Sequence, residues 1–370
     1  MPSISQLEEL VRRTAAEAGF DLAGIAPVED LQELEYFPAW IAEGRHGEMR
    51  YMEARDDQGR LKRASLQNTA PWAKSVVVCA MNYNTAQPYS TDTYEASRGW
   101  ISRYAWGQSD YHDVILPRLR QIESRLRESA GDIHTWCYVD TGPVVERVLA
   151  RYAGIGWIGK NACIINQQLG SWLFLGVILT SLELQPDLPA PDRCGTCTRC
   201  LDACPTQAFM SPGKVDATRC ISYLTIEKRG AIPEDLRPGM GRHVFGCDIC
   251  QDVCPWNTRA ASRRAVSTQP EFQARPGLVD PSLDHLVNMS EEDFREQFRG
   301  SPIKRAKRSG LRRNAVIAMG NSGDASFLPT LRNFAEDDSD PVMAEHACWA
   351  IQRIEQVRPE KQASVSYAAE

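Results

Sequence analysis

The sequence predicts a multidomain α+β protein of 370 residues built in three parts. Strand and helix patterns alternate before residue 185, eight of the 12 cysteines fall between Cys194 and Cys254, and only helical patterns follow residue 263. A chain of this length can bury a large core and is expected to form two or three domains. We therefore predict an α/β domain over 1–185, a cysteine-rich domain over 186–262 and a helical region over 263–370.

The first domain begins with an amphipathic helix, because Ile4, Leu7 and Val11 recur on one side of the first twenty residues. Neither this segment nor any apolar run further along is long enough for a signal peptide or a membrane span. We therefore expect a chain of the reducing cytoplasm with no membrane partner. Periodicity predicts strands at 20–26, 75–81 and 133–139, helices at 114–126 and 143–152, and a hairpin joining 162–166 to 172–180.

Two cysteine runs follow a proline-punctuated linker. The run Cys194 to Pro205 has the spacing C-x2-C-x2-C-x3-C-P, and the run Cys247 to Pro255 repeats its last three cysteines and its proline. Bacterial ferredoxins hold two [4Fe–4S] clusters with this pattern. A zinc site is the main alternative, since a single C-x2-C pair is common in zinc sites, and a disulfide framework is disfavoured.

The ferredoxin pattern also predicts how the thiolates are shared, because the cysteine before each proline binds the other cluster. Cluster two lacks a leading cysteine in its own run, and Cys220 is the candidate to complete it. The predicted ligands are Cys194, Cys197, Cys200 and Cys254 for cluster one, and Cys204, Cys220, Cys247 and Cys250 for cluster two. The remaining cysteines, Cys79, Cys137, Cys163 and Cys348, are expected to be small core residues.

The tail contains a helix around 311–319 that ends at Gly320–Gly323, a second around 327–334, and a third with Asp340 as cap and Pro341 in its first turn. Such a pattern is typical of a HEAT-like repeat, here spanning about 310–356. The basic segment 304–313 overlaps its start and contains no acidic residue, on a chain whose net charge is −6. It can be a phosphate-binding patch or simply a solvated helix face, and composition alone favours the latter.

Three further motifs are ambiguous from the residues alone. The glycine-rich stretch 154–161 imitates nucleotide-binding loops, but a helix precedes it and a strand follows, which is the wrong order. The stretch Asp110–His112 is like the start of the corrinoid motif D-x-H-x-x-G, whose histidine ligates cobalt, but Ile115 replaces its glycine. His112 is therefore expected to be an ordinary hydrogen-bonded histidine. Asp140 follows a buried strand, where base rates favour a turn-stabilising role over a catalytic one.

Together these stretches resemble the epoxyqueuosine reductase family, cobalamin-dependent iron–sulfur enzymes of tRNA modification. The resemblance runs nearly from end to end. It rests on the eight cysteines and on the segments 104–112, 140–143, 156–161, 170–171 and 220–230.

The resemblance implies an N-terminal domain that binds base-off cobalamin, with Asp140 as proton donor. It implies that epoxyqueuosine at the tRNA wobble position is reduced to queuosine, with electrons from a flavodoxin- or ferredoxin-type donor. The cofactor contacts it implies are Arg63, Tyr104, Asp140, Ser171, Ser222 and Thr225. The tRNA contacts it implies are Lys304, Arg305, Lys307, Arg308, Arg312 and Arg313, with Lys228 and Arg229 beside them.

The chemistry is coherent, because clusters pass single electrons and cob(I)alamin can hold the two that epoxide reduction requires. Three other functions compete with it. They are a reductive dehalogenase-like corrinoid enzyme, a ferredoxin-type electron-transfer protein, and a tRNA-binding protein whose clusters are structural.

Overall fold

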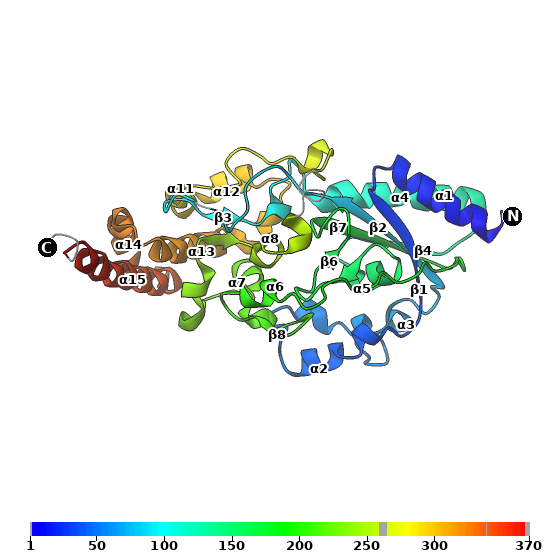
Figure 1. The fold of residues 1–370 in the computed structure, drawn as a ribbon, viewed down its shortest axis with the longest axis horizontal. Helices are drawn as coiled ribbons and strands as arrows, with labels where there is room; N and C mark the ends of the chain where they lie inside the picture. Colours follow the sequence, from blue (N-terminus) through cyan, green and yellow to red (C-terminus); the bar gives the residue numbers. More distant parts are fainter. Residues whose placement is uncertain (1, 93, 259–264, 338, 367–370) are drawn as a thin grey trace.

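The computed structural model describes the chain except residues 1, 93, 259–264, 338 and 367–370, and describes side chains as far as residue 356 (Figure 1). Its N-terminal part is built on one four-stranded sheet. The strands β1 (Leu22–Pro27), β2 (Ser75–Asn82), β7 (Leu173–Thr180) and β4 (Thr135–Tyr138) lie in the order β1-β2-β7-β4. Every neighbouring pair is antiparallel. The prediction of an α/β domain is therefore wrong, and the domain is α+β, because α/β sheets are parallel.

Helices cover both faces of this sheet (Figure 1). On one face α1 (Ile4–Glu17) packs on α4 (Tyr111–Ala130) in a shared apolar cluster, and on the other α3 (Leu66–Thr69) and α5 (Glu146–Tyr152) pack in a second cluster. All eight residues of β2 are buried, as expected for a strand covered on both sides. The predicted strands and the first helix are thus confirmed to within a few residues.

The connection after α5 differs from the prediction. The strand β6 (Ile164–Ile165) pairs with β5 (Trp157–Ile158). Between β6 and β7, an isolated β-bridge joins Asn166 to Gly170. The strand β7 instead inserts between β2 and β4, so the predicted 162–166/172–180 hairpin is wrong. Short apolar runs do not reveal their partners, because several strands can pair with them equally well.

As far as residue 258, the cysteine region contains only short elements, as expected where ligands replace a hydrophobic core. They are α6 (Arg199–Asp202), β8 (Phe209–Ser211), β9 (Lys214–Val215), α7 (Ile221–Ile226), β10 (His243–Phe245), α8 (Ile249–Asp252) and α9 (Pro255–Thr258). The strand β10 pairs in parallel with β3 (Trp100–Ile101) and so joins this region to the N-terminal part.

The tail is helical, with α11 (Leu283–Asn288), α12 (Glu291–Gln297), α13 (Lys307–Ser322), α14 (Leu328–Ala335) and α15 (Pro341–Ser366). The predicted cap at Asp340 is confirmed, since Asp340 accepts from Met343 N at 3.0 Å, and Ser290 forms a capping box at the start of α12. Gly320 lets α13 approach α15 closely, because a Cβ there would lie 2.8 Å from Ala350 Cα. The assignment to HEAT-like repeats stays a prediction.

One large apolar core spans the predicted domains. It joins α2 (Phe37–Ala42) and β3, from the N-terminal part, to α7, β10 and the helices α11–α15. The boundary at 185/186 stays a prediction, and the boundary at 262/263 falls next to residues that are not described. Among the described residues, no helix combines the length and apolar character needed to cross a bilayer.

Candidate functional site

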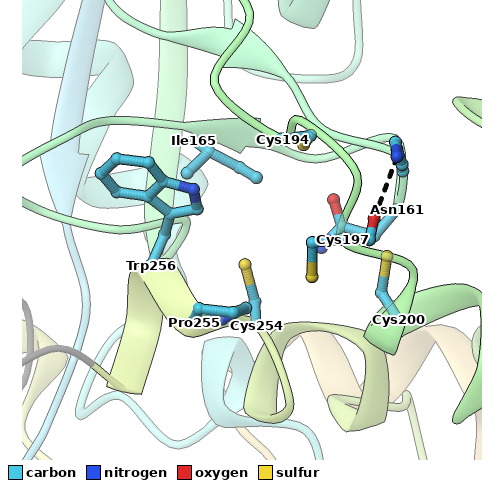
Figure 2. Close-up of a pocket in the computed structure, with 9 residues that line it drawn as sticks. Asn161, Ile165, Cys194, Cys197, Cys200, Cys254, Pro255 and Trp256 are labelled. Carbon is cyan, nitrogen blue, oxygen red and sulfur yellow. Dashed lines mark hydrogen bonds between the residues drawn. The ribbon is translucent and has the colours of Figure 1, made fainter.

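Four cysteines converge at one pocket near the surface. Figure 2 shows Cys194, Cys197, Cys200 and Cys254 around a space that is closed on one side by Trp256 and Ile165. Three of these cysteines are half-buried and Cys254 is buried. The two cysteine runs therefore meet in space, and their meeting matches the predicted ligand set of cluster one.

The glycine-rich stretch 154–161 lies against this pocket. Lys160 Nζ donates to the carbonyl oxygens of Gly195 at 2.7 Å and Cys197 at 3.0 Å, and the indole nitrogen of Trp157 lies 3.4 Å from Cys194 Sγ. The stretch follows α5 and contains β5, so the rejection of a nucleotide-binding loop is consistent with the structure. Sequence reasoning missed the contribution of these two side chains to the cysteine pocket.

The second set of cysteines is more deeply buried. Burial, and then the charge of Cys220, raises the pKa of Cys247 well above its usual value. The thiols of Cys204 and Cys220 likewise interact with each other, and Cys250 interacts with Cys247 and Cys220. The four predicted ligands of cluster two are thus neighbours. Bound iron would offset the mutual repulsion of their thiolates.

A fifth thiol lies at this second set. Cys163, predicted to be an ordinary core residue, interacts directly with Cys250, and its pKa is lowered mainly by that hydrogen bond. It reaches this position because the β5–β6 hairpin folds over the cysteine region. Nearby, the side-chain amide of Asn161 donates to the Cys250 carbonyl at 3.2 Å.

Each of the two sets offers four thiols. Four thiolates are the number that one [4Fe–4S] cubane takes, so the two sets fit two clusters.

A buried carboxylate fixes the turn between two of these cysteines. Asp248 accepts hydrogen bonds from Arg103 N at 2.8 Å, from Trp100 Nε1 at 3.0 Å and from the Ser102 hydroxyl. These donors lie on β3 and η4 (Arg103–Ala105). Asp248 therefore attaches the cluster-two turn to the N-terminal part of the chain.

Tyr104, in the same η4 turn, links the cysteines to Asp140. Burial raises the pKa of Tyr104 well above its usual value, and the nearby carboxylates of Asp140 and Asp248 add to the shift. Gly246 permits this packing, because a Cβ there would lie 2.4 Å from Ser102 Cβ and 3.6 Å from the Tyr104 ring. Tyr104 therefore borders both the cluster-two turn and the Asp140 loop.

Asp140 lies in a strained loop directly after β4. Its φ is +49°, in the left-handed region that Asp tolerates better than most residues. Two residues on, a Cβ at Gly142 would lie 2.4 Å from the Tyr138 ring, so glycine is required for this close approach. Arg63 donates to Gly142 O at 2.9 Å and to Tyr51 O at 2.7 Å. Arg63 thus supports the Asp140 loop, and a cobalamin contact by it stays a prediction.

Three residues around Asp140 form one hydrogen-bonded group. His112 Nε2 lies 2.8 Å from Asp140 Oδ1, and its Nδ1 lies 2.6 Å from Asp110 Oδ1. The hydroxyl of Tyr111 donates to Asp140 Oδ2. Burial opposes a charged imidazole, but the hydrogen bonds and charges of the two aspartates outweigh it and raise the pKa of His112 to about 10. The prediction that His112 is a hydrogen-bonded histidine is confirmed.

A second carboxyl group lies close to Asp140. Burial raises the pKa of Glu146, at the start of α5, to about 7, and the charge of Asp140 adds to the shift. Among the described residues, its Oε1 is buried without a hydrogen-bond partner. Sequence reasoning gave no signal for this residue.

Two of the predicted cofactor contacts serve the fold instead. Ser171 is 4% exposed, and its Oγ accepts from Asn257 Nδ2 at 2.8 Å. Thr225 is 1% exposed, and its hydroxyl accepts from Gly246 N at 2.9 Å. Cofactor contacts through these hydroxyls are therefore not supported, because neither presents a free surface. Ser222 is half-buried, and its contact stays a prediction.

The basic segment divides into exposed and structural side chains. Lys304, Arg305 and Lys307 are all exposed, but Arg305 also pairs with Glu227 at 2.9 Å. Arg308 and Arg312 donate through Nε to the carbonyls of Met289 and Val287, beside the end of α11. The C-terminus of α11 favours these two positive charges, because helix C-termini are negatively polarised.

Arg313 is buried, with only 3% of its surface exposed. Its guanidinium donates to Leu224 O, Lys228 O, Gly230 O and Asn314 Oδ1. The prediction that it contacts tRNA is therefore wrong, since a buried guanidinium with these partners cannot reach a phosphate.

Lys228 and Arg229 lie next to the basic segment. Lys228 pairs with Glu48, and Arg229 donates to Arg305 O at 2.8 Å and to Ala306 O at 3.2 Å. Arg229 therefore braces the turn before α13, whereas Lys228 is held by Glu48, and a phosphate contact by either stays a prediction.

The fold and the site define an iron–sulfur oxidoreductase, with two cysteine sets beside an aspartate–histidine group. The model for a "4Fe-4S double cluster binding domain" matches residues 193–257, and the model "Epoxyqueuosine reductase QueG, DUF1730" matches residues 63–141. An epoxyqueuosine reductase from Xanthomonas campestris is 41% identical over 344 residues, covering 92% of this chain and 94% of that protein. The chain belongs to the epoxyqueuosine reductase family.

Other relatives agree with this. The epoxyqueuosine reductase of Escherichia coli is 38% identical over 356 residues, covering 95% of this chain and 91% of that protein. A crystal structure of epoxyqueuosine reductase with an epoxyqueuosine-modified tRNA-Tyr stem loop superposes with a TM-score of 0.83 at 34% identity. The enzyme from Bacillus subtilis, with a catalytic aspartate loop swung out of its active site, gives 0.83 at 33% identity. Both structural matches cover 95% of this chain and 91% of the other.

Proposed function

We propose that this protein reduces epoxyqueuosine to queuosine at the wobble position of tRNA anticodons. The observation that carries the proposal is that the basic segment begins beside the Asp140 group. The charge of Asp140 contributes to the raised pKa of Arg305, after the larger effect of its bond to Glu227. The charge of Lys304 likewise lowers the pKa of Asp110. Burial alone would raise this pKa, but the hydrogen bonds from His112 outweigh burial, and Lys304 adds a smaller effect. A polyanion bound at the segment would thus bring its bases next to a proton-bearing group.

The eight cysteines would hold two clusters, cluster one and cluster two, which would supply one-electron transfer between an external donor and the site. We assign Cys194, Cys197, Cys200 and Cys254 to the first, and Cys204, Cys220, Cys247 and Cys250 to the second. The half-buried thiols of cluster one are accessible to a flavodoxin- or ferredoxin-type donor. Cluster two lies deeper, and its Cys247–Cys250 turn borders Tyr104 and through it the Asp140 loop.

Bound base-off cobalamin would supply a reductant able to collect two electrons from these one-electron carriers. The residues present fit such a ligand near Asp140. Tyr104 has a half-buried ring there, and the buried Glu146 Oε1 without a partner could accept from a corrin amide group. Ser222 lies on α7, on the cysteine side of the same region.

Asp140 would donate a proton to the epoxide oxygen. Reduction of an epoxide to an alkene and water consumes two electrons and two protons, so the oxygen must be protonated to leave. The Asp140 side chain is 56% exposed and therefore accessible to a base presented from an anticodon loop. The unpaired base can enter the site at little cost, because it leaves no duplex.

The tRNA backbone would be bound by the two lysines of the basic segment, Lys304 and Lys307, with Arg305, Arg308 and Arg312 as neighbours that also bond within the protein. The helices α13–α15 behind them would extend this surface as a HEAT-like repeat.

The test is turnover of Asp140→Asn on epoxyqueuosine-containing tRNA, with iron and cobalt content measured in the same sample. We expect normal iron and cobalt with a loss of at least about 100-fold in turnover, within the range for a missing general acid. Asp132→Asn is the matched control, because Asp132 is exposed before β4. Wild-type turnover by Asp140→Asn would rule out its proton-donor role. A wild-type protein that never takes up cobalt would contradict the proposed function itself.

A further inference from the structure

The surroundings of Asp140 do not match those of a simple carboxylic acid donor. A carboxyl group stays protonated near neutral pH when it is buried or lies beside a negative charge. Asp140 is instead more than half exposed, and each of its oxygens faces a donor group. Oδ1 lies 2.8 Å from His112 Nε2, and Oδ2 accepts from the Tyr111 hydroxyl. Both oxygens of Asp140 are therefore engaged by neighbouring side chains on α4.

The imidazole of His112 is held from its other side. Its Nδ1 lies 2.6 Å from Asp110 Oδ1, and the same oxygen accepts from His112 N at 3.1 Å. Asp110 is the N-cap of α4, so its position is fixed by the helix that carries His112 and Tyr111. A carboxylate at Nδ1 orients an imidazole and stabilises its protonated form, as in hydrolase triads.

We propose that His112 carries the proton that Asp140 delivers, so that Asp110, His112 and Asp140 form a relay able to supply both protons of the reduction. This inference rests on the proposed function and extends it. Asp140 remains the catalytic residue, because it meets the substrate. His112 acts through Asp140, and Asp110 positions the ring of His112.

The chemistry balances with the electron source already named. An external donor of the flavodoxin or ferredoxin class supplies the two electrons, both C–O bonds of the epoxide break, a C=C bond forms, and the oxygen leaves as water. The first proton passes from His112 Nε2 through Asp140 to the oxygen. The ring is 31% exposed, so water can reprotonate Nε2 before the second transfer.

The other charged and titratable groups around the relay come from several elements. Glu146 on α5 adds negative charge near Asp140, and burial and neighbouring charge keep Tyr111 and Tyr104 protonated. The positive charge of Arg305 interacts with the carboxylate of Asp140. The positive charges of Lys304 and Arg275 interact with the carboxylate of Asp110. Tyr51, in η2 (Arg50–Glu53), also lies near Asp140. The two aspartates that bond to the ring outweigh its burial, and they hold the pKa of His112 at about 10.

The first experiment measures the proton directly in the wild-type holoenzyme. The chain has six histidines, so ¹⁵N-histidine labelling gives a small set of imidazole signals, and His112→Gln identifies the one from His112. At pH 8 we expect both ring nitrogens of His112 to carry protons, whereas an ordinary exposed histidine is neutral there. A neutral His112 at pH 8 would overturn the proposal, whatever the variants do.

The second experiment is the pH profile of turnover. In His112→Gln the amide can still donate to Asp140 but carries no titrating proton. We expect a fall of about 100-fold in kcat with little change in KM for tRNA, and an alkaline limb that moves to lower pH. Asp110→Asn should move the same limb in the same direction by a smaller amount. His285→Gln serves as control, since His285 bonds to Gln297 on the tail.

The outcomes separate the two proposals. If Asp140→Asn is inactive while His112→Gln keeps the wild-type kcat and pH profile, the relay is wrong and the proposed function stands. If Asp140→Asn keeps full turnover, the proton-donor role fails and the relay with it. Iron and cobalt content measured in each variant show that the site is intact.

Discussion

The basic segment before and within α13 offers a sharp prediction, because neighbouring cations in it have opposite roles. Arg313→Met removes a guanidinium that bonds to three carbonyl oxygens and one side-chain amide oxygen. A buried acceptor left without a partner costs about 1–3 kcal/mol, and methionine replaces much of the lost apolar stem. We therefore expect a loss of about 3–5 kcal/mol in the free energy of unfolding, at the upper end of single substitutions.

The double variant Lys304→Ala/Lys307→Ala should behave in the opposite way. Both side chains are exposed, so stability should change by less than about 0.5 kcal/mol. If each lysine neutralises one phosphate, the slope of log affinity against log salt should become shallower by about 1.4 to 1.8. The folded fraction of Arg313→Met should instead bind the tRNA stem loop with the wild-type salt slope.

Anaerobic urea denaturation measures the stability of each variant, and stem-loop binding at several salt concentrations measures the slope. The reasoning is refuted if Arg313→Met is as stable as wild type and has a shallower slope. It is equally refuted for the lysines if their double variant binds RNA with unchanged affinity and slope.

The remaining predictions concern the cysteines, the Asp140 loop and pH. Cys220→Ser should lower the iron content from about eight to about four atoms per chain. The control Cys163→Ser, which changes an adjacent cysteine that is not a predicted ligand, should retain about eight. Equal iron content in both variants would remove Cys220 from the ligand set. Gly142→Ala should displace the loop, because the added Cβ would lie 2.4 Å from the ring beneath it, and cost about 100-fold in kcat at unchanged iron content. His346 accepts from Ile232 N at 3.1 Å, and burial lowers its pKa to about 4. The folded state disfavours the protonated ring, so the contribution of His346 to the free energy of unfolding is full above about pH 6.5. It falls by about 3 kcal/mol toward pH 4. Urea titrations at each pH should show a smaller fall for His346→Gln.

Much of the cluster region could be predicted from the sequence. Ligand spacing is a local property, because three thiolates on one short turn must bind one cubane whatever surrounds them. The caps at Ser290 and Asp340 were predictable for the same reason, since each side chain bonds to backbone within the next turn. Cys163 was not, because it approaches Cys250 only through the fold of the β5–β6 hairpin.

The Asp140 group shows the limit of local patterns. His112 lies in the first turn of α4 and Asp140 lies after β4, 28 residues later, and neither position alone favours catalysis over an ordinary turn. Their contact depends on how α4 packs on the sheet. The order of the strands likewise escaped prediction, because β7 can pair with any apolar strand and only the packed sheet selects β2 and β4.

By itself, then, the sequence determined the chemical inventory of this protein: the two cysteine runs, the approximate positions of the main sheet strands and longer helices, and a segment rich in positive charge. The tertiary structure alone decided which arginine is buried and which lysines face solvent, and that an imidazole lies against Asp140. The physical reason is that spacing along the chain fixes contacts within a turn or two, whereas burial and charge pairing between distant segments arise only when packing removes their surfaces from water.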